Sequence, residues 1–139
     1  MSAKKLPWSE KAFDGLLLKT SLADFAALAH GRWAEEIGPQ QGFQTFLELD
    51  PKRVAVSSKH LPDDPKWPLH TWTSAVKAVT RDAKGVFTVT CEWSQESNAK
   101  GYRGAQQTPA QFTYRLWPVA PGIIWFQEGE QYWLKLKRE

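Results

Sequence analysis

The alternation of apolar side chains in the C-terminal third of the chain constrains the fold more than any other feature. Residues 111–137 read QFTYRLWPVAPGIIWFQEGEQYWLKLK, three runs rich in β-branched, aromatic and aliphatic residues. Pro118–Gly122 and Glu128–Glu130 separate the runs, since proline presets φ and glycine adopts positive φ without strain. In the first and last runs every second side chain is apolar, the period of a strand with one buried face. The segment therefore predicts a three-stranded antiparallel meander.

Two segments near the N-terminus carry the features of helices. Ser9 is a suitable N-cap, and apolar residues flank it with the spacing of a hydrophobic staple. Ser21–Asp24 has the pattern of a capping box with an acid in the first turn. Apolar residues then recur at helical spacing until a Gly-Pro pair. These features predict one helix at about 9–18 and a second at about 22–37.

Further strands are predicted between the helices and the meander. They cover residues 42–49, 52–58, 72–81 and 86–93. The first two alternate around an Asp-Pro turn and predict a hairpin, and the third is rich in β-branched residues. Residues 59–71 contain three prolines and residues 94–109 are polar, so both segments are predicted to be loops.

The predicted fold class is α+β in a single domain, residues 1–139, with residues 1–8 as a flexible leader. N-terminal helices would pack on a curved, mainly antiparallel sheet of about six to seven strands. This arrangement resembles the cone-shaped α+β architecture shared by nuclear-transport-factor-like and cystatin-like proteins. The resemblance is one of architecture alone, and no family motif is recognised.

Composition restricts the classes of partner and compartment. The net charge of +3 is small for a protein whose affinity depends on phosphate contacts. No stretch approaches the ~20 apolar residues of a membrane span, and no secretory apolar region is present, which predicts a cytoplasmic protein without a membrane partner. The single cysteine, Cys91, excludes an internal disulfide and lies in an alternating run, where it is predicted to be a buried structural thiol.

His60, Asp63, Asp64 and His70 form the candidate catalytic group. Imidazole titrates near neutrality and a carboxylate can orient it, so these residues could act as a general acid and base. Their spacing matches no strong metal motif, and exposed turn chemistry explains it equally well. No metal and no cofactor are therefore expected.

Lys100, Tyr102 and Arg103 form a second candidate group, on the glycine-containing loop at 94–109. Two cations and an aromatic ring can grip a phosphate or stack on a base. The alternative is a solvated hairpin loop without a ligand.

Trp117, Trp125 and Trp133 form the third group. Each is out of step with apolar neighbours in its strand, so the strands present large apolar groups on both faces. Such strands are covered on both sides, line a pocket, or form an interface. We therefore predict that these three tryptophans contact a ligand or a partner.

Three functions are compatible with these features. The first is a small non-enzymatic protein that binds a protein partner or an apolar small ligand through an aromatic sheet surface or cavity, with homodimerisation as a companion. The alternative is a small cofactor-free enzyme with a His/Asp acid–base pair between helix and sheet. The third is nucleic-acid binding through the 94–109 loop.

Overall fold

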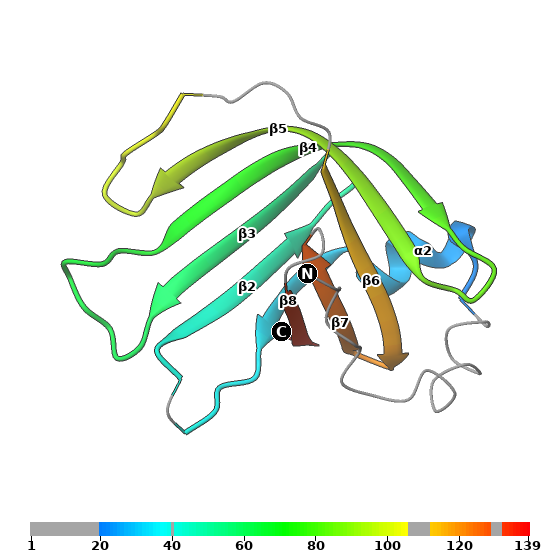
Figure 1. Cartoon of the computed structure of the whole chain (residues 1–139), viewed down its shortest axis with the longest axis horizontal. Coiled ribbons are helices and arrows are strands. Elements are labelled where there is room, and N and C mark those ends of the chain that lie inside the picture. Colours follow the sequence, from blue (N-terminus) through cyan, green and yellow to red (C-terminus); the bar gives the residue numbers. More distant parts are fainter. Residues whose placement is uncertain (1–19, 40, 106–111, 129–131) are drawn as a thin grey trace, which may run out of the picture.

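Eight antiparallel strands close into a barrel in which each strand pairs with its neighbours in the sequence and β8 pairs with β1 (Figure 1). The computed structural model describes residues 20–39, 41–105, 112–128 and 132–139, and for Trp93, Phe112, Tyr132 and Trp133 the backbone alone. The predicted leader and the helix predicted at 9–18 lie outside these residues. In the described ranges, neither helical segment has the length and apolar character that crossing a bilayer requires.

The elements follow one another in a simple order. They are η2 (Leu22–Asp24), α2 (Phe25–Ala29), β1 (Gly31–Glu35), β2 (Phe43–Leu49), β3 (Arg53–His60), β4 (His70–Arg81), β5 (Phe87–Asn98), β6 (Phe112–Ala120), β7 (Ile123–Glu128) and β8 (Tyr132–Arg138). The predicted meander is confirmed as β6, β7 and β8, and the predicted hairpin as β2 and β3.

The α+β prediction is wrong because the helix predicted at 22–37 ends at Ala29. His30 is extended and Gly31 has a φ of 125°, a value that an L side chain rarely adopts. The chain then enters β1, where Trp33 is 1% exposed and pairs with Leu47. In this segment the pairing of β1 with β2 and β8, together with the burial of Trp33, stabilises the strand more than the helical spacing of the apolar residues stabilises a helix. A closed barrel also replaces the cone-shaped architecture that the predicted arrangement resembles.

The predicted loops are longer than those in the structure. β3 continues to His60 and β4 starts at His70, so the loop predicted at 59–71 narrows to 61–69. The loop predicted at 94–109 is wrong at its start, because residues 94–98 extend β5 and pair with β4 beyond a register shift at Ser74/Ala75. Residues 106–109 lie outside the described residues.

Inward-facing apolar side chains fill one half of the barrel. The buried core joins α2 to the strands and contains Phe25, Ala29, Trp33, Leu47, Leu49, Val54, Val56, Phe87, Val89, Cys91, Tyr114, Leu116, Ile124, Phe126 and Leu136. Phe25 of α2 packs on Phe87 with ring centroids 4.9 Å apart. The η2–α2 segment therefore covers this end of the barrel, whereas the loop at 61–69 and the hairpin tip after Asn98 lie at the opposite end (Figure 1).

Arg138 joins the end of β8 to the C-terminus of α2. Its guanidinium donates to the carbonyl oxygens of Ala27, Leu28 and His30, groups that a helix end leaves without an intrahelical partner. The same guanidinium lies 4.6 Å from the ring centroid of Trp33, a cation–π contact. One side chain thus fixes the covering helix to the closing strands.

Arg138→Ala is expected to lower the free energy of unfolding by about 1–2 kcal/mol, because helix carbonyls and an aromatic face lose their donor together. Urea unfolding followed by tryptophan fluorescence measures this loss. Arg32→Ala is the matched control, since Arg32 is exposed and its ion pairs to Glu48 and Glu139 span 4.0 and 3.4 Å. Its effect is expected to stay within about 0.5 kcal/mol. Equal midpoint shifts in the two variants would contradict the role given to Arg138.

Cys91 is confirmed as a buried thiol, at 0% exposure. Burial raises its pKa to about 12, because the thiolate would lose its hydration. A raised folded-state pKa stabilises the fold fully below the reference value of 9.0 and loses that contribution as the pH rises towards 12.

The native protein at pH 8 is expected to react with a thiol-specific disulfide reagent about a thousandfold more slowly than the urea-unfolded chain, because far less thiolate is present. The release of the reagent's chromophore measures both rates. Rapid labelling of the folded protein would show that the thiol is accessible and ionised.

Candidate functional site

The barrel is hollow at the end opposite the helix. A cavity of about 290 Å³ crosses the lumen and is lined by Thr45, Val56, Ser58, Trp72, Tyr114 and Glu128. The first four come from β2, β3 and β4, and the last two are paired across β6 and β7. The hollow follows from side-chain size, because the inward positions Thr45 and Ser58 oppose each other. In the filled half of the same hairpin, leucine and valine take the corresponding positions.

A second pocket of about 180 Å³ adjoins this cavity at the rim. It shares Ser58 and Trp72 with the cavity and adds Phe43, His60, Trp67, Pro68 and His70. The His60 ring lies edge-on to Phe43 at 5.3 Å and stacked on Trp67 at 6.5 Å. The rim is therefore mostly aromatic, and the loop at 61–69 supplies part of it.

Exposed hydrophobic side chains gather at this same end. The described residues include seven large hydrophobic side chains that are more than a third exposed: Leu22, Ile37, Phe43, Trp67, Leu69, Trp72 and Tyr102. All except Leu22 belong to strand ends or loops at the hollow end of the barrel. Such a concentration marks a binding surface more specifically than scattered exposed residues do.

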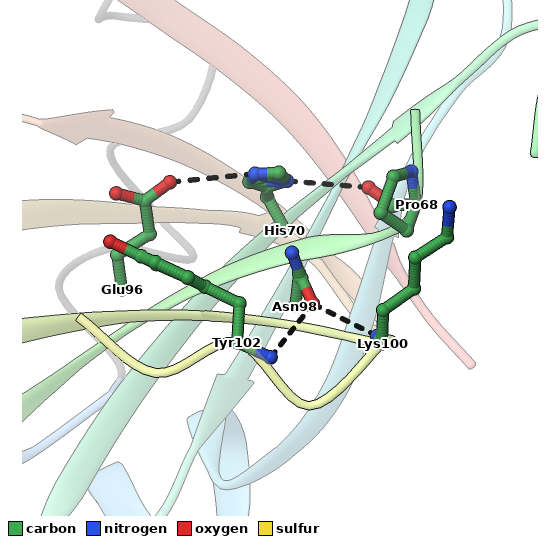
Figure 2. A network of polar contacts seen from close by, with 6 residues as sticks. All are labelled: Pro68, His70, Glu96, Asn98, Lys100 and Tyr102. Atoms are coloured by element: carbon green, nitrogen blue, oxygen red, sulfur yellow. Dashed lines mark hydrogen bonds and ion pairs between the residues drawn. The ribbon is translucent and has the colours of Figure 1, made fainter. Parts of the chain in front are cut away.

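Both predicted histidines lie at the rim and are held by proline carbonyls. His60 Nδ1 is 2.9 Å from the Pro62 oxygen, and His70 Nδ1 is 3.3 Å from the Pro68 oxygen. Because a carbonyl only accepts, Nδ1 carries the proton in each ring. Figure 2 shows His70 between Pro68 and Glu96, whose Oε1 is 3.4 Å from His70 Nε2. The carboxylate beside a histidine is thus that of Glu96, which lies inside the predicted 94–109 loop.

Asp63 and Asp64 lie apart from the two histidines. They line a groove of about 470 Å³ on the outer side of the 61–69 loop. Asp63 Oδ1 is 3.1 Å from Lys59 Nζ, and Asp64 Oδ1 accepts a hydrogen bond of 2.9 Å from the Lys66 backbone N–H. The structure therefore brings His60 and His70 into one pocket and places the two aspartates in another. Within the described part of the chain, no three His, Cys, Asp or Glu side chains are grouped to hold a metal ion.

The predicted cationic hairpin is ordered by Asn98. Its Oδ1 accepts from the backbone N–H groups of Lys100 and Tyr102, at 2.9 and 3.1 Å (Figure 2). Arg103 forms a β-bridge with Ser97, so alternation places Tyr102 on the side of Glu96 and Arg103 on the opposite side. The three residues therefore do not share one face.

Two of the three tryptophans that the sequence singled out, Trp117 and Trp125, lie on the outward parity of their strands, away from the lumen. Trp117 and Trp125 pair with each other across β6 and β7, out of step with the inward Leu116 and Phe126. Trp117 is 2% exposed and carries the Arg115 guanidinium 5.0 Å above its ring. The Trp133 side chain is outside the described atoms.

Sequence reasoning missed Trp72, Tyr114, Glu128 and Phe43 as site residues. All four are on the inward parity of their strands, near the ends that meet at the hollow end. The sequence shows only that these side chains alternate with outward-facing ones along each strand. It does not show which strand ends meet, because that depends on the closure of the sheet.

Comparisons with family models, with curated proteins and with solved structures found no match to this chain. Its function is therefore inferred from the cavity and from the side chains that line it.

Proposed function

We propose that this protein is a non-enzymatic binding protein that holds one small, largely apolar ligand in the hollow end of its barrel. The observation that carries the proposal is the division of the lumen. Among the described residues, fifteen buried apolar side chains form the core, and two of them, Val56 and Tyr114, border the cavity that remains beyond it.

The dimensions suit a single small molecule. An eight-stranded barrel is just wide enough either for side chains to fill it or for one small ligand to enter. The cavity of about 290 Å³ is joined at Ser58 and Trp72 to the rim pocket of about 180 Å³. Pockets for small ligands begin at roughly 300 Å³ and combine apolar walls with a few polar groups. Val56, Trp72 and Tyr114 supply the apolar walls here.

The contacts of the histidines favour binding over catalysis. Pro68 and Glu96 take the two ring nitrogens of His70, and His60 lies between Phe43 and Trp67. The enzyme alternative requires a histidine and an aspartate side by side. Asp63 and Asp64 lie in the outer groove instead, away from both histidines. An acid–base role requires a group within hydrogen-bond reach of the substrate proton, and the rim offers packing contacts instead.

The remaining proposals are less specific. Nucleic-acid binding through the hairpin loses support because Tyr102 and Arg103 lie on opposite sides of it.

A protein partner or a second copy of the chain would bind the same exposed aromatic residues of the rim and so compete with a small ligand. A cytoplasmic location is proposed because Cys91, the single cysteine of this chain, is a buried free thiol. It cannot form an internal disulfide, so the fold does not require an oxidising compartment.

Ser58→Trp tests the binding site directly, because Ser58 lines both pockets and an indole at this position fills them. N-phenyl-1-naphthylamine, a neutral apolar dye that brightens when shielded from water, serves as the ligand. The native protein is expected to bind it with a Kd on the order of micromolar, and Ser58→Trp to bind it at least tenfold more weakly.

Ala55→Trp is the matched control, because Ala55 is on the outward parity of the same strand and pairs with Glu48 and Thr73. It is expected to keep the native affinity. Equal affinity in native protein and Ser58→Trp would place the dye elsewhere and remove the proposed site, as would an absence of dye binding to the native protein.

A further inference from the structure

We infer that the ligand of the barrel is a neutral aromatic alcohol of two fused rings, with its rings against Trp72 and the aromatic rim and its hydroxyl group between Thr45 and Ser58. The inference rests on the proposed binding site and adds the chemical class of the molecule that occupies it. It follows from the order of inward-facing side chains along the β2–β3 hairpin, from the hydroxyl pair itself and from the rings around the mouth.

The inward-facing side chains of β2 and β3 change character in layers. From the core to the mouth the pairs are Leu47 with Val56, Thr45 with Ser58, and Phe43 with His60. The first pair is buried and apolar, the second carries two hydroxyl groups and the third carries two aromatic rings. Because a strand rises about 3.4 Å per residue, neighbouring layers are about 7 Å apart. A ligand of two fused rings can therefore reach from the aromatic layer to the hydroxyl layer.

Thr45 and Ser58 supply the hydroxyl groups of the middle layer. Both line the cavity, and Ser58 also lines the rim pocket, so this layer lies where the two spaces join. The Thr45 backbone N–H donates to Glu35 Oε1 at 2.9 Å, which fixes the strand where its pairing with β1 has ended. A hydroxyl group donates one hydrogen bond and accepts up to two. One hydroxyl group of a ligand can therefore donate to one of these side chains and accept from the other.

The rest of the cavity lining favours the same assignment. Glu128 and Tyr114 also line the cavity, and each already has an interaction partner. Val56 and Trp72 complete the lining with mostly apolar surface. The polar group of the ligand is therefore assigned to the two hydroxyl groups of the middle layer. An uncharged group satisfies them without the cost of taking a charge out of water.

The rings around the mouth hold fixed orientations. His60 is edge-on to Phe43, and its plane lies within 18° of the plane of Trp67. The Pro62 carbonyl oxygen, 2.9 Å from His60 Nδ1, holds the imidazole in this position. Trp72 borders both spaces and is 39% exposed. Aromatic rings that stack or meet edge to face gain free energy beyond the area they bury, so these walls favour an aromatic ligand over a saturated one.

Three bicyclic compounds of similar shape test the class of ligand, each in competition with N-phenyl-1-naphthylamine for the native protein. 2-Naphthol has the aromatic rings and the hydroxyl group, 2-methylnaphthalene lacks the hydroxyl group, and trans-decahydro-2-naphthol lacks the aromatic rings. All three are uncharged at neutral pH. 2-Naphthol is expected to bind at least about threefold more tightly than either of the others, because each of them loses one kind of contact.

Ser58→Ala and Thr45→Val remove the two hydroxyl groups and leave apolar side chains in their place. Each is expected to weaken the binding of 2-naphthol at least about threefold, because a hydrogen bond is lost, and to leave the affinity for 2-methylnaphthalene within about twofold. Ser57→Ala is the matched control, since Ser57 is on the outward parity of β3 and its hydroxyl lies 2.8 Å from that of Thr71. It is expected to keep the native preference. Unchanged affinity for 2-naphthol in either lumen variant would overturn the assignment to this hydroxyl pair.

The native protein alone also decides the question, even if the variants do not fold. If 2-methylnaphthalene displaces the dye as well as 2-naphthol does, the barrel binds small molecules but does not recognise a hydroxyl group, and the inference is wrong. Equally tight binding of the saturated alcohol would overturn the preference for aromatic rings in the same way. If the dye and all three compounds fail to bind, the proposed function and the inference fall together.

Discussion

The structure depends on the pairing of β1 with β8. Three register pairs join these strands, with Trp33 opposite Arg138, Ala34 opposite Lys137 and Glu35 opposite Leu136. On the outer side Glu36 forms ion pairs of 2.7 Å with Lys137 and 3.4 Å with Lys135. The hydrogen bond from Lys137 is the main cause that lowers the pKa of Glu36. Closure satisfies two strand edges that an open sheet would expose to other chains, and it encloses the lumen in which any ligand must lie.

Closure also explains how a short helical segment can cover one end of the sheet. A barrel has two ends, and η2 and α2 cover one of them through Phe25 and Ala29, while the guanidinium of Arg138 fixes the helix end. The other end stays hollow because its inward positions include Thr45 and Ser58, where leucine and valine occupy the filled half. Side-chain volume at alternate positions thus divides a continuous lumen into a core and a site.

The sequence predicted the strands far better than the architecture. Alternation located the β2–β3 hairpin and the β6–β8 meander, because a period of two reports one buried face. Residues 30–35 were predicted wrongly because their apolar residues recur at helical spacing. They form a strand instead, and one of its two partner strands, β8, lies about a hundred residues away in the sequence. His60 and His70 were found by residue type alone, and they do meet at the rim. Trp72 and Tyr114 were not, because they line a common cavity only once the sheet closes.

Alternation in a closed barrel sorts charge as well as apolar area. Along β3, Lys59 faces the outer groove while its neighbours Ser58 and His60 face the mouth. Cations that give the chain its net charge of +3 can therefore remain on the outside, paired to acids such as Asp63. Two carboxylates lie instead on the inward parity, with Glu128 in the cavity lining and Glu96 at the rim beside His70. The charge of the whole protein is thus a poor guide to its ligand, because the strand parity that builds the core also isolates the lumen from the surface.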